Sequence, residues 1–133
     1  MRALQIISLI ESAKQVSKNE LQEIEKVLDR LFAKVGIDVE FTKHFYDRLN
    51  DKRNGEQISV SELVALYTDE FKKYGDRISK MKNGADALLT DSKSFVNVPV
   101  VLKLNKDSGL IEMTAKTIMR AKRFHTRSKR LVV

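Results

Sequence analysis

The chain has 133 residues, 42% of them hydrophobic and 32% charged, which is typical of one folded domain and excludes an intrinsically disordered chain. It contains no cysteine, so disulfides, thiolate nucleophiles and cysteine-ligated zinc are excluded. No segment is apolar for long enough to span a bilayer, and we expect a cytoplasmic protein without a membrane partner.

The net charge of +7 comes from the C-terminal end. The sequence has 25 Lys and Arg residues against 18 Asp and Glu residues, and seven of the basic residues follow Met113, where no acid occurs. The preceding part of the chain is therefore neutral overall. A concentrated cationic segment attracts phosphate backbones through Coulomb attraction and counterion release, so we expect it to bind RNA or DNA. A solvated tail is the alternative.

Residues 1–36 predict an N-terminal helical hairpin. Apolar residues recur at helical spacing over residues 2–14 and again over residues 21–35. Ser17 to Glu20 has the pattern of a capping box, and Gly36 is placed to end the second helix. Two helices bury little surface alone, so we expect them to pack as one unit with residues 37–133 or to bind a protein partner.

The middle of the chain predicts a short strand and two helices. Alternating apolar residues indicate a strand over 37–41, and Thr42 is placed to cap a helix that runs to about residue 50. A second capping box, from Ser59 to Glu62, starts a longer amphipathic helix. We expect that helix to end at Gly75.

The remainder predicts a small antiparallel sheet. A short strand is expected over 87–90, and alternation predicts two longer strands over 97–104 and 110–119, joined by a turn that ends at Gly109. Residues 127–133 form either an edge strand or a tail. Helices followed by an antiparallel sheet indicate the α+β class.

The segment from His44 to Arg48 is the most specific local pattern. On a helix these two residues share a face, and Asp47 approaches the same side. A histidine can transfer a proton near neutral pH, and an arginine one turn away offers planar donors to a phosphate. RNA cleavage without a metal needs both functions. A helix-surface charge network is the alternative, and spacing alone favours it.

A second group of candidate residues lies on the expected last strand and the tail. Lys116 and Arg120 are expected on one strand face, opposite Met113 and Met119, where they would bind a phosphate backbone. A solvated sheet face is the alternative. The full set of expected nucleic-acid contacts is Lys43, Arg53, Lys116, Arg120, Lys122, Arg123 and Arg127.

No metal or cofactor is expected. The five glycines are scattered and form no phosphate-binding loop, and His44 and His125 are the only histidines. His44 and Asp47 have a spacing that suits a hard metal ion, but two ligands are weak evidence for a site.

The residues from Phe41 to Arg48 resemble the RegB type of phage endoribonuclease, which carries a His-x-x-Asp-Arg element before an amphipathic helix. The order of a helix pair and a sheet with a basic last strand is similar to RelE-type mRNA interferases. The run from Lys116 to Arg120 also resembles small tailed-phage proteins without an assigned role. The resemblance covers about residues 41–123 and implies helices on one side of a sheet and metal-independent RNA cleavage in a groove.

The resemblance implies catalytic roles for His44 and Arg48. RegB has a second functional histidine that has no counterpart at the comparable distance here, and His125 is the candidate replacement. The leading hypothesis is therefore an RNA-binding, RelE/RegB-like endoribonuclease of phage origin that acts in the host cytoplasm. It requires His44 and Arg48 to open onto the same concavity as Lys116 and Arg120.

Two other functions remain open. One is a non-enzymatic interaction protein of a phage virion or head, in which the basic tail neutralises DNA or binds an acidic partner. The other is the toxin of a toxin–antitoxin pair. In the virion protein, His44 and Arg48 would belong to a structural charge network.

Overall fold

The computed structural model describes residues 15–133, in which three α-helices pack on a six-stranded sheet. The α+β prediction is confirmed. The expected helix over 2–14, and with it the first half of the helical hairpin, lies outside the described residues. The elements are α2 (Lys18–Phe32), η1 (Ala33–Val35), β1 (Ile37–Phe41), α3 (Lys43–Leu49), η2 (Lys52–Asn54), α4 (Val60–Ser79), β2 (Asp86–Thr90), β3 (Val96–Leu104), β4 (Ile111–Ala115), β5 (Met119–Arg120) and β6 (Lys129–Val132).

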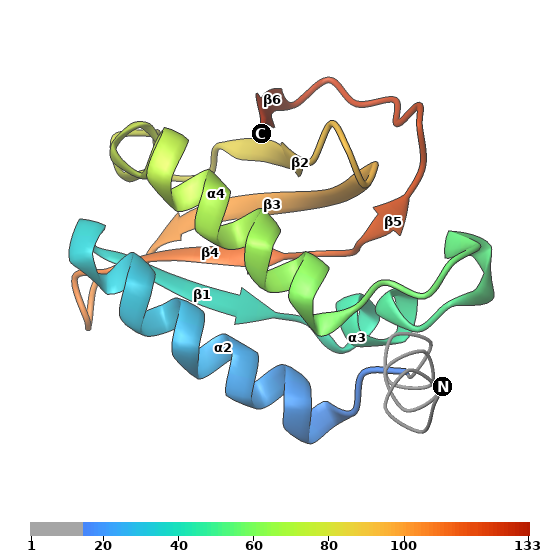
Figure 1. Cartoon of the computed structure of the whole chain (residues 1–133). Coiled ribbons are helices and arrows are strands. Elements are labelled where there is room, and N and C mark those ends of the chain that lie inside the picture. The colour runs from blue at the N-terminus through green and yellow to red at the C-terminus, as the bar shows by residue number, and fades with distance from the viewer. Residues whose placement is uncertain (1–14) are drawn as a thin grey trace.

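The sheet has the order β1-β4-β3-β2-β6, and β5 pairs with the start of β3. Antiparallel pairing was expected throughout, and it holds for β2, β3, β4 and β5. The two edge strands differ, because β1 pairs with β4 and β6 pairs with β2 in parallel. Parallel neighbours need long connections, and α3 and α4 lie in the connection that follows β1. Figure 1 shows α2 and α4 on the same face of this sheet.

The helix α2 begins as its sequence predicts, but it ends at Phe32, and the 3-10 turn η1 continues to Val35. The Ser17 hydroxyl accepts a hydrogen bond from the Glu20 N–H at 3.1 Å, and the Glu20 carboxylate accepts one from the Ser17 N–H at 3.1 Å. After η1, Gly36 adopts a φ of 75°, which an L side chain rarely tolerates. The amphipathic stripe therefore faces the sheet over the full length of the helix.

Two carboxylates of α2 also cover the outer edge of β1. The Asp29 side chain accepts a hydrogen bond from the Val39 N–H at 2.6 Å, and Glu25 accepts one from the Phe41 N–H at 3.0 Å. These strand N–H groups would otherwise be open to pairing with another chain. The helix thus protects one edge of the sheet as well as its face.

The helix α4 is longer than expected. It passes through Gly75 and ends at Ser79, so the prediction that Gly75 ends it was wrong. Gly75 is buried, and a Cβ there would lie 3.4 Å from the Phe71 ring. The glycine therefore provides space for a neighbouring aromatic side chain within the helix. No helix in residues 15–133 is long and apolar enough to cross a bilayer.

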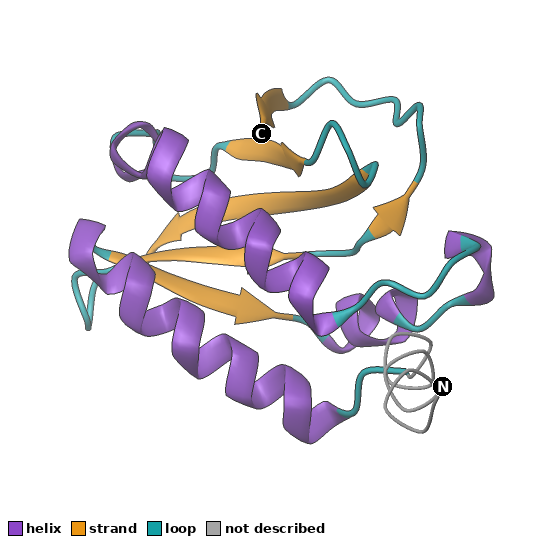
Figure 2. Cartoon of the chain, in the orientation of Figure 1, coloured by secondary structure: helices purple, strands orange, loops and turns teal. Residues whose placement is uncertain are grey.

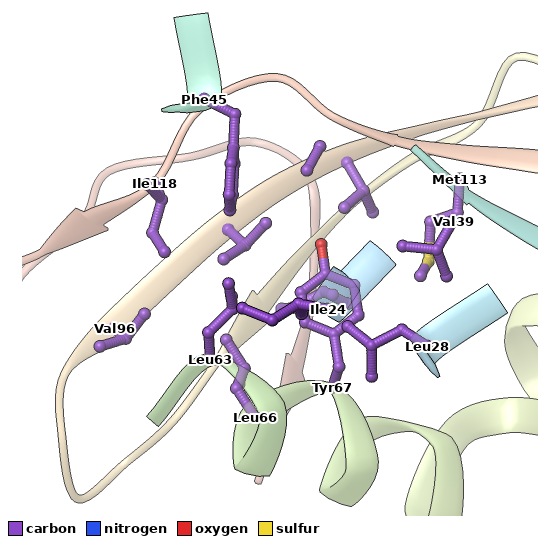
Figure 3. Packing of buried hydrophobic residues seen from close by; sticks show 14 of the residues in the cluster. Ile24, Leu28, Val39, Phe45, Leu63, Leu66, Tyr67, Val96, Met113 and Ile118 are labelled. Atoms are coloured by element: carbon purple, nitrogen blue, oxygen red, sulfur yellow. The ribbon is translucent and has the colours of Figure 1, made fainter. Parts of the chain in front are cut away.

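Figure 2 shows the helices lying against the sheet. The described residues share one hydrophobic core between these two layers (Figure 3). Tyr67 of α4 meets Phe32 of α2 edge to face at a centroid distance of 6.1 Å. The ring of Phe41 meets Tyr67 in the same way at 5.6 Å and stacks on Phe45 of α3 at 4.6 Å. These rings join α3 to the larger helices, so its position relative to the sheet is well determined.

The last predicted strand, over 110–119, is interrupted by a β-bulge. Ala115 pairs with Val100, and Met119 pairs with Asn97. Residues 116–118 therefore lie opposite residues 98 and 99, three against two. The extra residue shifts the alternation, and Ile118 points into the core beside Phe45 (Figure 3). The expectation that Met113 and Met119 share a face was therefore wrong.

Pro99 explains where the β3–β4 ladder stops. Its carbonyl accepts the Lys116 N–H at 3.0 Å, but it has no N–H to return. Proline inside a sheet is usually confined to edges and bulges for this reason. The bulge over 116–118 lies directly opposite this missing donor.

An acidic cluster lies on the neighbouring strands β1 and β4. Carboxylate oxygens of Asp38, Glu40 and Glu112 lie within 4.8 Å of one another. Burial, hydrogen bonding with Asp38 and repulsion from nearby acids raise the pKa of Glu40 to about 7. Burial is also the main cause that raises the pKa of Asp29 to about 6.

The acidic cluster predicts a pH dependence of stability. The folded state retains the Glu40 proton in a range where the unfolded chain releases it, so the cluster stabilises the fold at low pH. That stabilisation is lost as the pH rises through about 7. We expect Glu40→Gln to raise Tm by about 3–5 °C at a pH of about 8. We expect no gain at a pH of about 4.

Thermal unfolding of the variant across this pH range is the measurement. The matched control is Glu23→Gln, which alters an exposed glutamate on α2. The account would be contradicted if the difference in Tm between Glu40→Gln and the wild type did not change with pH.

Candidate nucleic-acid interface

One end of the sheet collects most of the candidate residues. The pairing directions place the C-terminal ends of β1, β2, β4 and β6 together with the start of β3. His44 follows β1 by three residues, and Lys116 follows β4 directly. Figure 1 shows α3 and β5 at this same end. Loops and helix starts at the carboxyl ends of strands are where ligands commonly bind in sheet proteins.

Thr42 fixes the start of α3 against β4. Its hydroxyl oxygen accepts the Phe45 N–H at 3.0 Å, which makes it the expected helix cap. The same hydroxyl donates toward the carbonyls of Ala115 at 3.3 Å and Lys116 at 3.2 Å. The Lys116 carbonyl is available to Thr42 because Pro99 has no N–H to offer it. The bulge therefore positions the first turn of α3.

His44 and Lys43 are exposed on that first turn, and Lys116 is exposed beside it. Lys18 of α2 lies over the Tyr46 ring, 5.7 Å from its centroid, so the Tyr46 side of α3 faces α2. His44 lies two residues earlier, which is about 200° around the helix. The imidazole is therefore on the side of α3 that faces away from α2. Thr42 thus attaches the turn that carries His44 to the backbone of Lys116. Lys43 lies on the other side of that turn, where it lines a pocket with Tyr46 and residues of α2.

Arg48 does not share this exposure. It is 8% exposed, and its Nη1 lies 3.7 Å from the Asp51 carboxylate. Its Nε is buried without a hydrogen-bond partner. The predicted pair of His44 and Arg48 is therefore one exposed group beside one buried cation, and Arg48 contacts the end of its own helix.

Arg120 is turned to the opposite face of the sheet from Lys116. It pairs with the buried Val96, on the side of the helices, because the bulge shifts the alternation. The expectation that Lys116 and Arg120 share one face was wrong. Lys116 lies on the other face with Pro99.

All five donors of Arg120 are used inside the protein. Its two Nη atoms bind both oxygens of Glu62 at 2.8 and 2.9 Å, and the remaining donors bind the carbonyls of Ser94, Gln57 and Glu56. Burial acts to raise the pKa of Glu62, but the hydrogen bonds from Arg120 and Ser59 lower it overall. Arg120 thus joins β5 to the start of α4 and has no donor left for a phosphate in this arrangement.

Arg53 is exposed but engaged. Its guanidinium binds the Asp51 carboxylate, with the shortest contact at 2.9 Å. These hydrogen bonds lower the pKa of Asp51 to about 2. An exposed ion pair of this kind exchanges readily with solvent, so Arg53 retains the capacity to contact a ligand.

The remaining candidates lie in the connection from β5 to β6, over residues 121–128, which we call the basic arm. Lys122, Arg123, His125 and Arg127 are all exposed on it. The arm leads from β5 to the sheet edge farthest from β1 (Figure 1), and the Arg130 guanidinium donates to the Phe124 carbonyl. The expected edge strand is confirmed as β6. His125 therefore lies on a different segment of the surface from His44.

Sequence reasoning did not identify two residues at this end of the sheet. Phe95 is 37% exposed and has a φ of 61°. Asn97 is buried, and its amide donates to the carbonyls of Phe95, Met119 and Ala121. The asparagine inside a run of valines was the available signal, because a polar residue in a central strand needs partners.

Among residues 15–133, the one group of three acids close enough to bind a metal ion is the acidic cluster of Asp38, Glu40 and Glu112. Glu112 lies four residues before Lys116 on β4, which is about 13 Å along the strand. Glu40 lies closer, because it pairs with Thr114, two residues before Lys116.

No protein-family model, curated protein or solved structure matches the chain. The functional interpretation therefore depends on the geometry of the site.

The Arg120 network predicts a specific loss of stability. Lysine cannot reproduce the two-pronged contact with Glu62, so Arg120→Lys should reduce the free energy of unfolding by about 1–3 kcal/mol. The matched control is Arg53→Lys, where the same change at an exposed pair should cost less than about 0.5 kcal/mol. Urea denaturation measures both. Equal effects of the two substitutions would show that the Arg120 contacts are not structural.

Proposed function

We propose that the protein binds single-stranded RNA at this end of the sheet and cleaves it without a metal, as a RelE/RegB-like endoribonuclease. The observation that carries the proposal is the attachment of Thr42 to the Lys116 carbonyl, which holds His44 beside a cationic strand end. A proton-transfer group and a cation next to each other meet the two chemical needs of the reaction.

The chemistry divides between these groups. The His44 imidazole takes the proton of a ribose 2′-hydroxyl, whose oxygen attacks the adjacent phosphorus. The bond to the 5′-oxygen breaks, and that oxygen receives a proton from the imidazolium or from water. Lys116 stabilises the negative charge that develops on the phosphate, and Lys43 contacts a neighbouring phosphate on the α2 side of the helix start. The products are a 2′,3′-cyclic phosphate and a 5′-hydroxyl end.

Arg48 has a supporting role in this proposal. Its burial and its contact with Asp51 suit a group that holds the end of α3 in place. His125, on the basic arm, is proposed to contact the RNA away from the bond that is cleaved. The arm extends the binding surface, since it adds cations that are exposed on one continuous segment.

A second candidate function is RNA or DNA binding without cleavage, as in a phage virion or head protein. The observation that favours it is the internal engagement of both arginines nearest the site. Arg48 and Arg120 are held by Asp51 and Glu62, which leaves phosphate contact beside His44 to Lys116. The cleavage assay below separates the two functions.

The endoribonuclease proposal predicts cleavage in the presence of EDTA. The wild type should convert labelled RNA to fragments with cyclic phosphate ends, and His44→Ala should reduce the rate by about 100-fold or more. The matched control is His125→Ala, which removes the other histidine and should have a much smaller effect.

Gel analysis of the fragments gives both rates. Intact RNA with the wild type, under conditions where the RNA is bound, would favour the binding function over cleavage. Equal losses in the two variants would contradict the assignment of His44.

RNA binding should weaken strongly with salt. With about four phosphate contacts on a single strand, the logarithm of the association constant should fall with a slope of about −3 against the logarithm of salt concentration. Lys116→Gln should reduce the magnitude of this slope by about 0.7. The control is Lys103→Gln, an exposed lysine near the C-terminal end of β3 that pairs with Glu112. Fluorescence anisotropy measures the slopes, and a wild-type slope near zero would exclude nucleic acid.

A further inference from the structure

Phe95 has an unusual conformation at the end of the sheet. Its φ of 61° lies in the left-handed region, and it is the one residue other than glycine with positive φ among residues 15–133. A bulky side chain there is strained, whereas glycine is not. The ring is 37% exposed and is not part of the hydrophobic core. Core packing therefore does not explain why an aromatic side chain occupies this position.

The backbone around Phe95 is held in place by neighbouring strands. Its N–H donates to the Asp91 carbonyl at 3.0 Å, and its carbonyl accepts the Ala121 N–H at 2.9 Å. The buried Asn97 side chain donates to the same carbonyl at 2.9 Å and accepts the Thr90 hydroxyl at 2.7 Å. These contacts fix the strained residue, so the ring is presented from a rigid base. Such strain commonly occurs at binding sites.

The basic arm begins beside this ring. Lys122 lies over the Phe95 ring with its Nζ 5.7 Å from the centroid, and Arg123 is exposed next along the chain. The Ala121 contact ties the arm to Phe95 directly. An exposed ring with neighbouring cations is the arrangement that binds single-stranded nucleic acid, because a base stacks on the ring while the flexible cations bind the phosphates.

We propose that Phe95 is a stacking platform for an unpaired base of the RNA, with Lys122 binding the adjacent phosphate. This inference rests on the proposed function and extends it, since it identifies how the bound strand is held away from His44. Phe95 lies just before β3, and His44 lies just after β1, two strands across the sheet. A single strand that spans both positions would cross Lys116, which follows the intervening β4.

The first test uses Phe95→Gly, which removes the ring and relieves the backbone strain. We expect an unchanged or higher unfolding midpoint and RNA binding that is about tenfold weaker. The probe is a fluorescein-labelled 2′-O-methyl oligoadenylate, which has no free 2′-hydroxyl and so cannot be cleaved. Binding by Phe95→Gly as tight as that of the wild type would overturn the platform and leave the proposed RNA binding intact.

The second test uses the absence of tryptophan from the chain. Phe95→Trp creates a single tryptophan, which can be excited selectively over the three tyrosines. Its fluorescence should be quenched by the oligoadenylate and not by the same strand in a duplex, where the bases are already stacked. The matched control is Leu104→Trp, at the other end of β3 with a similar exposure of 42%. It should not respond to RNA.

The outcomes separate the two proposals. Unchanged Phe95→Trp fluorescence with saturating RNA, or equal quenching by the duplex, would overturn base stacking while binding itself is still measured by anisotropy. No binding of the oligoadenylate by the wild type would overturn the proposed function and this inference together.

Discussion

The missing N–H of Pro99 is the constraint on which the functional end of this molecule depends. It stops the β3–β4 ladder at Lys116, and the bulge that follows has two consequences. The Lys116 carbonyl becomes the acceptor for Thr42, which anchors the helix that carries His44. The change of alternation also turns Arg120 toward the helices, where it binds Glu62. One backbone feature therefore sets the positions of a candidate catalytic group and of a structural ion pair.

The basic residues of the C-terminal region consequently divide into two kinds. The hydrogen-bond donors of Arg120 are used inside the protein, so its charge stabilises the junction of β5 and α4. Lys116 and the residues of the basic arm are exposed and remain available to a polyanion. The acidic cluster lies along β1 and β4 before these residues, so its negative charge disfavours a polyanion over the middle of the two strands.

Much of the fold could be predicted because it follows from local rules. Both capping boxes and the Thr42 cap occur as their sequence patterns indicate, and the α+β order is correct. The failures have a common origin in tertiary contacts. Periodicity gives no sign of the bulge opposite Pro99, so the face of Arg120 was assigned wrongly. Periodicity also cannot tell whether a glycine such as Gly75 ends a helix or lies inside it. Nor can it reveal that burial in the folded protein raises the pKa of Glu70 to about 9.

The central claim is that RNA lies across the end of the sheet formed around the Pro99 bulge. Photocrosslinking with RNA that contains 4-thiouridine, followed by mass spectrometry of the peptides, tests it most directly. The account predicts crosslinks to the segments that contain His44, Phe95, and Lys116 to Lys122. Crosslinks confined to α2, or to the β3–β4 turn at the opposite end of the sheet, would contradict it.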